Sequence, residues 1–300
     1  MSKKIMRVKI YRMDHLPGAE LPDATEYGTL QSLQEFDEKG NLTLEIAYTH
    51  DGEIGDKNEF RYDENGRLVE SRVYGEDDEI LERNEISRDK NGRIISERVH
   101  YLDGSTDTRS YHYDDKGNLT GMEMRDDEDE LEYSEKYYYE NDRLVKIERR
   151  NEENEIVFSQ EDTYAEGVIR TRKVWSDEQE EPFSLITEYN RFGHREKETR
   201  FDSRDKMIER NIYEEDDQGR LIRVVEENRQ RKNTTEISND AHGNVVYQKE
   251  VDVHGELNHE VYRMYDEHGN LLKVTVEALQ KNTGQKRAYT LVHLYEISED

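Results

Sequence analysis

A short turn segment recurs about every 25 residues along most of the chain. Clear copies are FDEKGNL at 36–42, YDENGRL at 62–68, YDDKGNL at 113–119 and YDEHGNL at 265–271. The ten turn positions are Gly40, Gly66, Gly92, Gly117, Asp142, Gly167, Gly193, Gly219, Gly243 and Gly269, at spacings of 24 to 26 residues. So regular a spacing predicts an array of structural repeats.

Each repeat is predicted to be a β-hairpin. Apolar and polar residues alternate on both sides of the turn, as in Phe60 and Tyr62 before it and Val145 and Ile147 after it, which is typical of strands. In the turn, the Asp side chain can accept backbone N–H groups and the Gly can adopt positive φ. A second, polar turn lies about halfway between successive glycine turns, as at Asp51-Gly52 and Asp103-Gly104.

The expected fold is all-β: an antiparallel β-meander of about ten 25-residue hairpin repeats that form one long, twisted or spiralling sheet. We expect one moderately apolar face and one charged face. Residues 1–27 are predicted to form an N-terminal cap, 28–278 the ten repeats, and 279–300 a closing strand. The apolar run Ala288–Ile297 would seal a sheet edge or pair edge to edge with a second copy.

The charge of the chain is spread evenly. With 44 Lys+Arg and 72 Asp+Glu the net charge is −28, and only 32% of residues are hydrophobic. Such a composition suits a thin sheet with a solvated face and disfavours direct binding to nucleic acid. There is no apolar run long enough to span a membrane, no cysteine and no apolar segment after the N-terminus, so we expect a cytoplasmic protein.

The motif Y-D-x-x-G-[RN]-L followed by an alternating strand, as in YDENGRLVE, YDDKGNLTG and YDEHGNLLK, resembles the YD repeat, also called the RHS repeat. The resemblance covers roughly residues 28–278. It implies long sheets that spiral into hollow shells, which in large secreted or surface proteins often enclose a toxin. This chain is far shorter and has no toxin domain after its repeats, so we expect a stand-alone relative with an open arc or half-shell.

Acidic clusters occupy several polar turns and would line one rim of a meander. Their carboxylates would focus a negative potential that could bind a partner, or they would only keep the sheet soluble. The segment Arg229–Lys232 is the basic exception. The candidate rim residues are Glu76, Asp77, Asp78, Glu79, Asp126, Asp127, Glu128, Asp129, Glu130, Glu178, Glu180 and Glu181.

An aromatic patch for a partner is a second candidate site. It combines the only tryptophan, Trp175, with Tyr137, Tyr138 and Tyr139 one repeat away. Aromatic residues favour interface centres, but packing across strands is the simpler and preferred account.

Catalytic and metal-binding signatures are missing from the sequence. The turn carboxylates lack the spacing of calcium-binding loops, and the ten histidines show no metal-ligand spacing. Neither a nucleophile motif nor a phosphate-binding loop occurs. We therefore predict no enzyme activity, no catalytic residue, no cofactor and no metal.

Three functions remain open. The first is a non-enzymatic protein-binding scaffold whose acidic surface holds a basic toxin or effector; the toxin connection of the YD/RHS resemblance gives this an immunity-like form. The second is a carbohydrate- or surface-binding module with tyrosine faces for stacking. The third is a structural part of a secretion or toxin assembly.

Overall fold

The computed structural model describes residues 4–166, 168–177, 181–280 and 283–297. The chain divides into two compact units: unit 1 consists of residues 1–108 and 259–300, and unit 2 of residues 109–258. Each unit is built from antiparallel strands in consecutive hairpins, and unit 1 adds one short helix.

The elements of unit 1 are β1 (Ile5–His15), α1 (Ala24–Tyr27), β2 (Thr29–Phe36), β3 (Leu42–Tyr48), β4 (Ile54–Tyr62), β5 (Leu68–Tyr74), β6 (Ile80–Arg88), β7 (Ile94–Tyr101), β21 (Leu271–Gln280) and β22 (Gln285–Ile297). Those of unit 2 are β9 (Leu119–Arg125), β10 (Leu131–Glu140), β11 (Arg143–Asn151), β12 (Ile156–Ala165), β13 (Val168–Ser176), β14 (Phe183–Tyr189), β15 (Arg195–Asp202), β16 (Met207–Glu215), β17 (Leu221–Asn228), β18 (Lys232–Asn239) and β19 (Val245–Asp252). The unit boundaries fall within β8 (Thr106–Tyr113) and β20 (Leu257–Tyr265).

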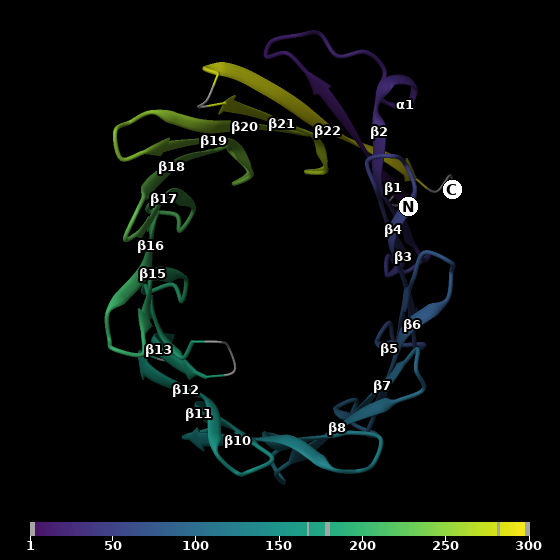
Figure 1. Ribbon diagram of the computed structural model, residues 1–300, viewed down its shortest axis with the longest axis vertical. Helices are drawn as coiled ribbons and strands as arrows, with labels where there is room; N and C mark the ends of the chain where they lie inside the picture. The colour runs from purple at the N-terminus through teal and green to yellow at the C-terminus, as the bar shows by residue number, and fades with distance from the viewer. Residues whose placement is uncertain (1–3, 167, 178–180, 281–282, 298–300) are drawn as a thin grey trace. The chain divides into compact units, whose positions relative to one another are not determined.

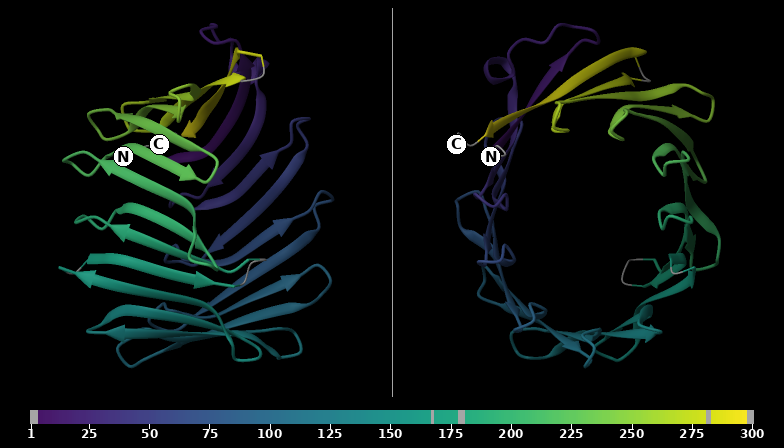
Figure 2. Two further views of the ribbon diagram at one scale, coloured as in Figure 1. Left: turned by 60° about the vertical axis from the view of Figure 1, so that its left-hand side comes forward. Right: turned by 180° about the vertical axis from the view of Figure 1, so that it is seen from behind.

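The first and last strands of the chain pair with each other inside unit 1. β1 lies between β2 and β22, antiparallel to both, and its pairing with β22 extends from Ile5 opposite Ile297 to His15 opposite Ala288. Figures 1 and 2 show β22 running alongside β1. We call these two paired strands the seam.

The seam corrects two expectations. The predicted open arc or half-shell is wrong, because β1 and β22 would be its two free edges and they are hydrogen-bonded to each other. Edge-to-edge self-association through Ala288–Ile297 would require a strand edge that is open along its whole length, and this segment has no such edge. Residues 288–292 have partners on both sides, in β1 and β21, and residues 293–297 pair with β1. The segment 279–300 thus contributes the end of β21 and all of β22, and residues 1–27 contribute β1 and α1.

Neighbours in the sequence are neighbours in each sheet. In unit 1 the pairing runs from β7 through β6, β5, β4, β3 and β2 to β1, and continues through β22 and β21 to β20. In unit 2 it runs from β9 to β19 without a crossover. Alternate turns therefore lie at the same end of the strands, which groups the glycine turns at one end and the polar turns at the other within each unit.

The turn between β2 and β3 shows why the Asp-x-x-Gly motif makes hairpins. Asp37 Oδ1 accepts the backbone N–H groups of Lys39 and Asn41 at 2.8 and 2.9 Å. Gly40 donates its N–H to the Asp37 carbonyl at 2.9 Å and has φ +85°, a region that L-residues seldom adopt. The side chain and the N–H of Asn41 lower the pKa of the Asp37 carboxyl. The turn therefore fixes both the hairpin and an ionised Asp.

A hydrogen bond between successive repeats explains the Tyr of the motif. The Tyr62 hydroxyl on β4 donates to the Leu42 carbonyl, which follows the preceding glycine turn, at 2.8 Å. Tyr164 and Leu144 repeat this contact in unit 2 at 2.7 Å. At two positions where another residue replaces the Tyr, that residue supplies the donor: Arg88 reaches the Leu68 carbonyl at 3.2 Å and Asn239 the Leu221 carbonyl at 3.0 Å.

Replacing Tyr62 with Phe is expected to lower the free energy of unfolding by about 1 kcal/mol, because a half-buried carbonyl loses its donor while the ring still packs. Thermal or denaturant unfolding measures the loss. Tyr27→Phe is the matched control, since that ring is 65% exposed and its replacement should leave stability within error. Equal losses in the two variants would contradict the role given to the Tyr62 hydroxyl.

Charged groups are buried on both faces of the sheet, which differs from the expected division into an apolar and a charged face. Glu135 and Glu148 are each only 7% exposed. Glu135 lies opposite Arg149, the residue after Glu148, so the two carboxylates face opposite sides of the sheet. The most apolar cluster lies at the seam, where Met13 and Val292 pack with Ala24 of α1.

Candidate functional site

The acidic turn of unit 1 connects β5 and β6. Glu76 and Asp77 are exposed, and within the described residues neither forms an ion pair. Asp78 has φ +61° and pairs with Lys57 of the neighbouring hairpin at 2.6 Å. This contact raises the pKa of Lys57, with the Asp78 hydrogen bond as the largest cause. Glu79 is half-buried at the end of the turn. Two of the four predicted residues are therefore open to a partner.

The acidic turns of unit 2 lie at one end of its strands. In the β9–β10 turn, Asp126 Oδ1 accepts the N–H groups of Glu128 and Glu130 at 3.0 and 2.8 Å. Asp129 has φ +63° and approaches Arg125 at 4.0 Å. The carboxylates that remain exposed without an ion-pair partner among the described residues are those of Asp127, Glu128 and Glu130. Glu181, in the β13–β14 connection, is also exposed. Glu178 and Glu180 lie outside the described residues.

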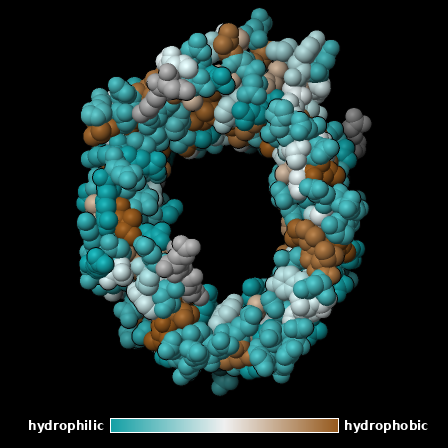
Figure 3. Space-filling model, in the orientation of Figure 1, coloured by the Kyte–Doolittle hydropathy of each residue, from teal (hydrophilic) through white to brown (hydrophobic). Residues whose placement is uncertain are grey.

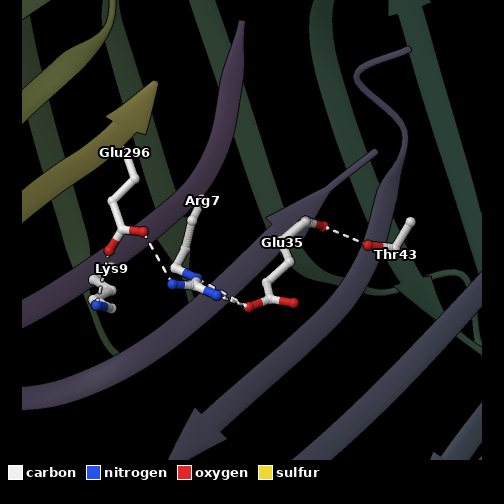
Figure 4. Close-up of polar contacts among 5 residues, drawn as sticks. All are labelled: Arg7, Lys9, Glu35, Thr43 and Glu296. Atoms are coloured by element: carbon white, nitrogen blue, oxygen red, sulfur yellow. Dashed lines mark hydrogen bonds and ion pairs between the residues drawn. The ribbon is translucent and has the colours of Figure 1, made fainter. Parts of the chain in front are cut away.

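Many charges on the strands form ion pairs with neighbouring strands. Arg172 and Asp162 form a bidentate pair across β12 and β13, with both N–O distances 2.8 Å. Figure 4 shows ion pairs of this kind at the seam, where Arg7 lies between Glu35 of β2 and Glu296 of β22. The Glu35 carbonyl also accepts a hydrogen bond from the Thr43 hydroxyl. Hydrophilic residues cover most of the surface visible in Figure 3, with hydrophobic residues in small separate patches.

The predicted structural glycines have the expected backbone where the structure describes them. Positive φ values occur at Gly40, Gly66, Gly92, Gly117, Gly193, Gly219, Gly243 and Gly269. Asp142, which takes the place of Gly in its repeat, has φ +60°, and Asn141 before it has φ +50°. Two consecutive left-handed residues are the signature of a tight type I′ hairpin. Gly167 lies outside the described residues.

The four predicted aromatic residues do not form one contiguous patch. Tyr138 lies in a cross-strand row with Lys146, Glu161 and Lys173, which places it on the same face as Trp175. Three strand spacings, roughly 14 Å, separate β10 from β13. Tyr137 lies on the other face, where burial is the largest cause of its raised pKa and a hydrogen bond to Glu135 adds to it. Tyr139 pairs with Leu144 beyond an irregularity in the ladder.

Trp175 lies instead in a groove of its own in unit 2. Cross-strand pairing places Ser159 on one side of it and Ser184 on the other. These small side chains leave space beside the indole ring, and the groove has a volume of 370 Å³. The other lining residues are Glu161, Lys173, Val174, Leu185, Ile186, Phe201 and Asp205. Trp175 is the second-last residue of β13, so the groove adjoins the acidic end of unit 2.

The described residues offer no group of three or more His, Asp or Glu side chains that could hold a metal ion. Burial of His293 in β22 lowers the pKa of its imidazole. Within the described ranges no helix has the length and apolarity needed to span a membrane.

The groove around Trp175 was not predicted, because it depends on register. The sequence marks Trp175 as unique, but Ser159 and Ser184 become its neighbours only when β12, β13 and β14 are aligned. The sequence signal for the groove is a small residue near the end of each strand adjacent to Trp175. This signal can be used only once the strand ends are known.

Solved structures resemble the chain only distantly. The crystal structure of TcdB2-TccC3-TEV has a TM-score of 0.32 and 12% identity, over 97% of this chain and 20% of that chain. A porin-like protein from Bacteroides uniformis has a TM-score of 0.32 and 9% identity, over 97% and 96% of the two chains. The Photorhabdus luminescens Tc holotoxin pore has a TM-score of 0.25 and 11% identity, over 88% and 19%. The chain spans about a fifth of the length of the two Tc chains. TM-scores this low support no conclusion about the fold or the function of the chain.

Sequence comparison is more informative. No curated protein matches the chain. The family model described as Teneurin YD-shell matches residues 4–166, more than half of the 300 residues. This match confirms the resemblance to YD repeats and agrees with a structural β-repeat scaffold. The inter-repeat contact of Tyr62 and the Asp-x-x-Gly turns supply the physical basis of that motif. The chain therefore belongs to the Teneurin YD-shell family.

Proposed function

We propose that the chain is a non-enzymatic β-repeat scaffold that binds a basic protein through its acidic turns. The supporting observation is a set of exposed turn carboxylates that form no ion pair within the described residues. Strand carboxylates such as Asp162 are neutralised by the chain itself, whereas Glu76, Asp77, Asp127 and Glu128 are exposed and have no ion-pair partner among the described residues. Unmatched surface charge of one sign attracts a partner of the opposite sign and accelerates its association.

An immunity-like neutraliser of a basic toxin or effector is the concrete form of this proposal. A basic nuclease has a cationic surface for its nucleic-acid substrate, and an acidic scaffold that covers that surface would block the substrate. Such a role places the chain in the bacterial cytosol together with its target. The net charge of −28 supplies the long-range attraction, and the turns supply the contacts.

The test compares the chain with a variant in which five turn carboxylates are neutralised: Glu76→Gln, Asp77→Asn, Asp127→Asn, Glu128→Gln and Glu130→Gln. Asp78, Asp126 and Asp129 are kept because they shape the turns. Association with a panel of purified basic nuclease domains is measured at low and high salt, together with inhibition of each nuclease. We expect at least one partner whose affinity falls roughly 10-fold or more in the variant and also falls with salt.

A matched control neutralises five exposed carboxylates at the glycine turns: Glu38→Gln, Glu64→Gln, Asp115→Asn, Asp217→Asn and Glu267→Gln. It changes the net charge equally and leaves the acidic turns intact. Equal weakening in both variants would show that only the total charge matters and would overturn the assignment to the polar turns. Absence of salt-sensitive association with every basic domain would refute the proposed function.

A further inference from the structure

Several aromatic rings of the chain are covered by its own cations. Arg149 lies 4.8 Å from the centroid of Tyr133, and Arg200 lies 4.1 Å from that of Phe183. Further contacts of this kind in unit 2 are Arg143 over Tyr164, Lys146 over Tyr138, Arg191 over Phe192 and Arg195 over Tyr213. Apart from Arg191 and Phe192, which are neighbours in a turn, these contacts join adjacent strands, so cation–ring pairs contribute to the packing of this sheet.

Trp175 departs from this pattern. Indole is the ring that binds cations most strongly, yet in the described part of the chain no Lys or Arg lies over it. Ser159 and Ser184 occupy the two cross-strand positions beside it. A serine at each position leaves the ring half-buried and beside a groove of 370 Å³. The groove therefore borders an aromatic ring that no cation of the described chain covers.

The charges around the groove favour an incoming cation. Glu161 and Asp205 line it, and Lys173 is its one basic lining residue. Glu161 pairs with Lys146 at 3.8 Å and lies opposite Lys173 across the β12–β13 ladder, whereas Asp205 forms no ion pair within the described residues. Asp177, two residues after Trp175, and Glu181 in the following connection are exposed and add negative charge at the same end of the strands.

The geometry points to a guanidinium-binding site: an arginine side chain of the basic partner enters the groove and stacks on Trp175, with Asp205 as its counter-ion. This assignment rests on the proposed function and names the anchor of the interface. The planar guanidinium combines stacking on an aromatic face with bidentate hydrogen bonding to a carboxylate. Tryptophan with arginine is also a pairing typical of interface hot spots.

The only tryptophan of the chain makes the test specific to this site. Trp175 emission is recorded during titration with a hexa-arginine peptide and with its hexa-citrulline counterpart, in which a neutral urea replaces each guanidinium. We expect a saturable change of emission with hexa-arginine and none with hexa-citrulline. Binding of the labelled arginine peptide, followed by anisotropy, should weaken roughly 5-fold in Trp175→Leu and less in Trp175→Phe, which keeps an aromatic ring.

The outcomes separate this inference from the proposed function. If hexa-arginine binds in a salt-sensitive manner but leaves Trp175 emission unchanged, and Trp175→Leu binds equally well, the groove is not the anchor and the acidic turns alone bind the partner. If neutral oligosaccharides change the emission and hexa-arginine does not, the groove binds carbohydrate and the inference is wrong. The variant with five neutralised turn carboxylates should bind hexa-arginine more weakly while reaching the same final emission at saturation.

Discussion

Replacing Asp162 with Ala is expected to lower the free energy of unfolding by about 3 kcal/mol, because the change leaves a buried ion pair with only one of its partners. The Asp162 side chain is only 1% exposed, and both its oxygens bind the Arg172 guanidinium at 2.8 Å. Gln160 donates to the same carboxylate at 3.1 Å. Removal of the carboxylate leaves a partly buried cation and an amide without their acceptor. Denaturant unfolding measures the loss.

Two controls isolate burial as the cause. Glu214 and Arg223 form a cross-strand pair of the same kind in unit 2, at 2.8 Å, with side chains 46% and 43% exposed. Glu214→Ala should cost less than about 1 kcal/mol, because solvent screens an exposed pair. The double variant Asp162→Leu/Arg172→Met removes both buried charges and should be more stable than Asp162→Ala alone. Equal losses for Asp162→Ala and Glu214→Ala would contradict the argument.

The hairpins could be predicted from the sequence because their cause is local. Asp37 and Gly40 are three residues apart and together satisfy the turn, whatever the rest of the chain does. The same local chemistry operates at the polar turns, where Asp78 and Asp129 adopt the left-handed backbone in place of glycine. The acidic clusters were visible for the same reason: their residues are consecutive and lie in turns.

The register across strands could not be predicted, and the candidate site depends on it. Ladder irregularities occur at the turns, for example between Glu35 and Phe36 and between Arg61 and Tyr62. Each irregularity shifts the alignment of one strand against the next, so counting residues from a turn misplaces the opposite side chain. The neighbours of Trp175, Ser159 and Ser184, were missed at this step. The proposed aromatic patch is wrong for a local reason, since the consecutive strand residues Tyr137 and Tyr138 lie on opposite faces.

The pairing of β1 with β22 at the seam cannot be predicted from local sequence patterns. The apolar run Ala288–Ile297 indicated a strand that closes an edge, but nothing in its composition names the partner strand. The partner is β1, nearly the full length of the chain away. A loop of that length adds little further entropic cost over a shorter one, so the pairing is decided by contacts such as Met13 with Val292 and the fully buried Thr290, which hydrogen-bonds Thr275 and His15.

A disulfide across the seam is therefore expected to form in the variant Arg7→Cys/Glu296→Cys. These residues are directly opposite each other in β1 and β22, and opposite residues of antiparallel strands have the Cα separation that a disulfide needs. The chain has no other cysteine, so thiol titration reports on this pair alone. The lost ion pairs of Arg7 and Glu296 are substantially exposed and cost little.

The oxidised variant should be about 4 kcal/mol more stable than the same protein after reduction, because the bond closes a loop of almost the whole chain in the unfolded state. Thermal or denaturant unfolding with and without reductant measures the difference. The control Arg7→Cys/Glu277→Cys places the second thiol on β21, level with His15 and roughly 26 Å along the strands from Arg7. It should keep both thiols free. An open arc would keep β1 and β22 apart, so free thiols in Arg7→Cys/Glu296→Cys would refute the seam. Oxidation of this variant, with both thiols of Arg7→Cys/Glu277→Cys left free, requires the two ends of the chain to be paired.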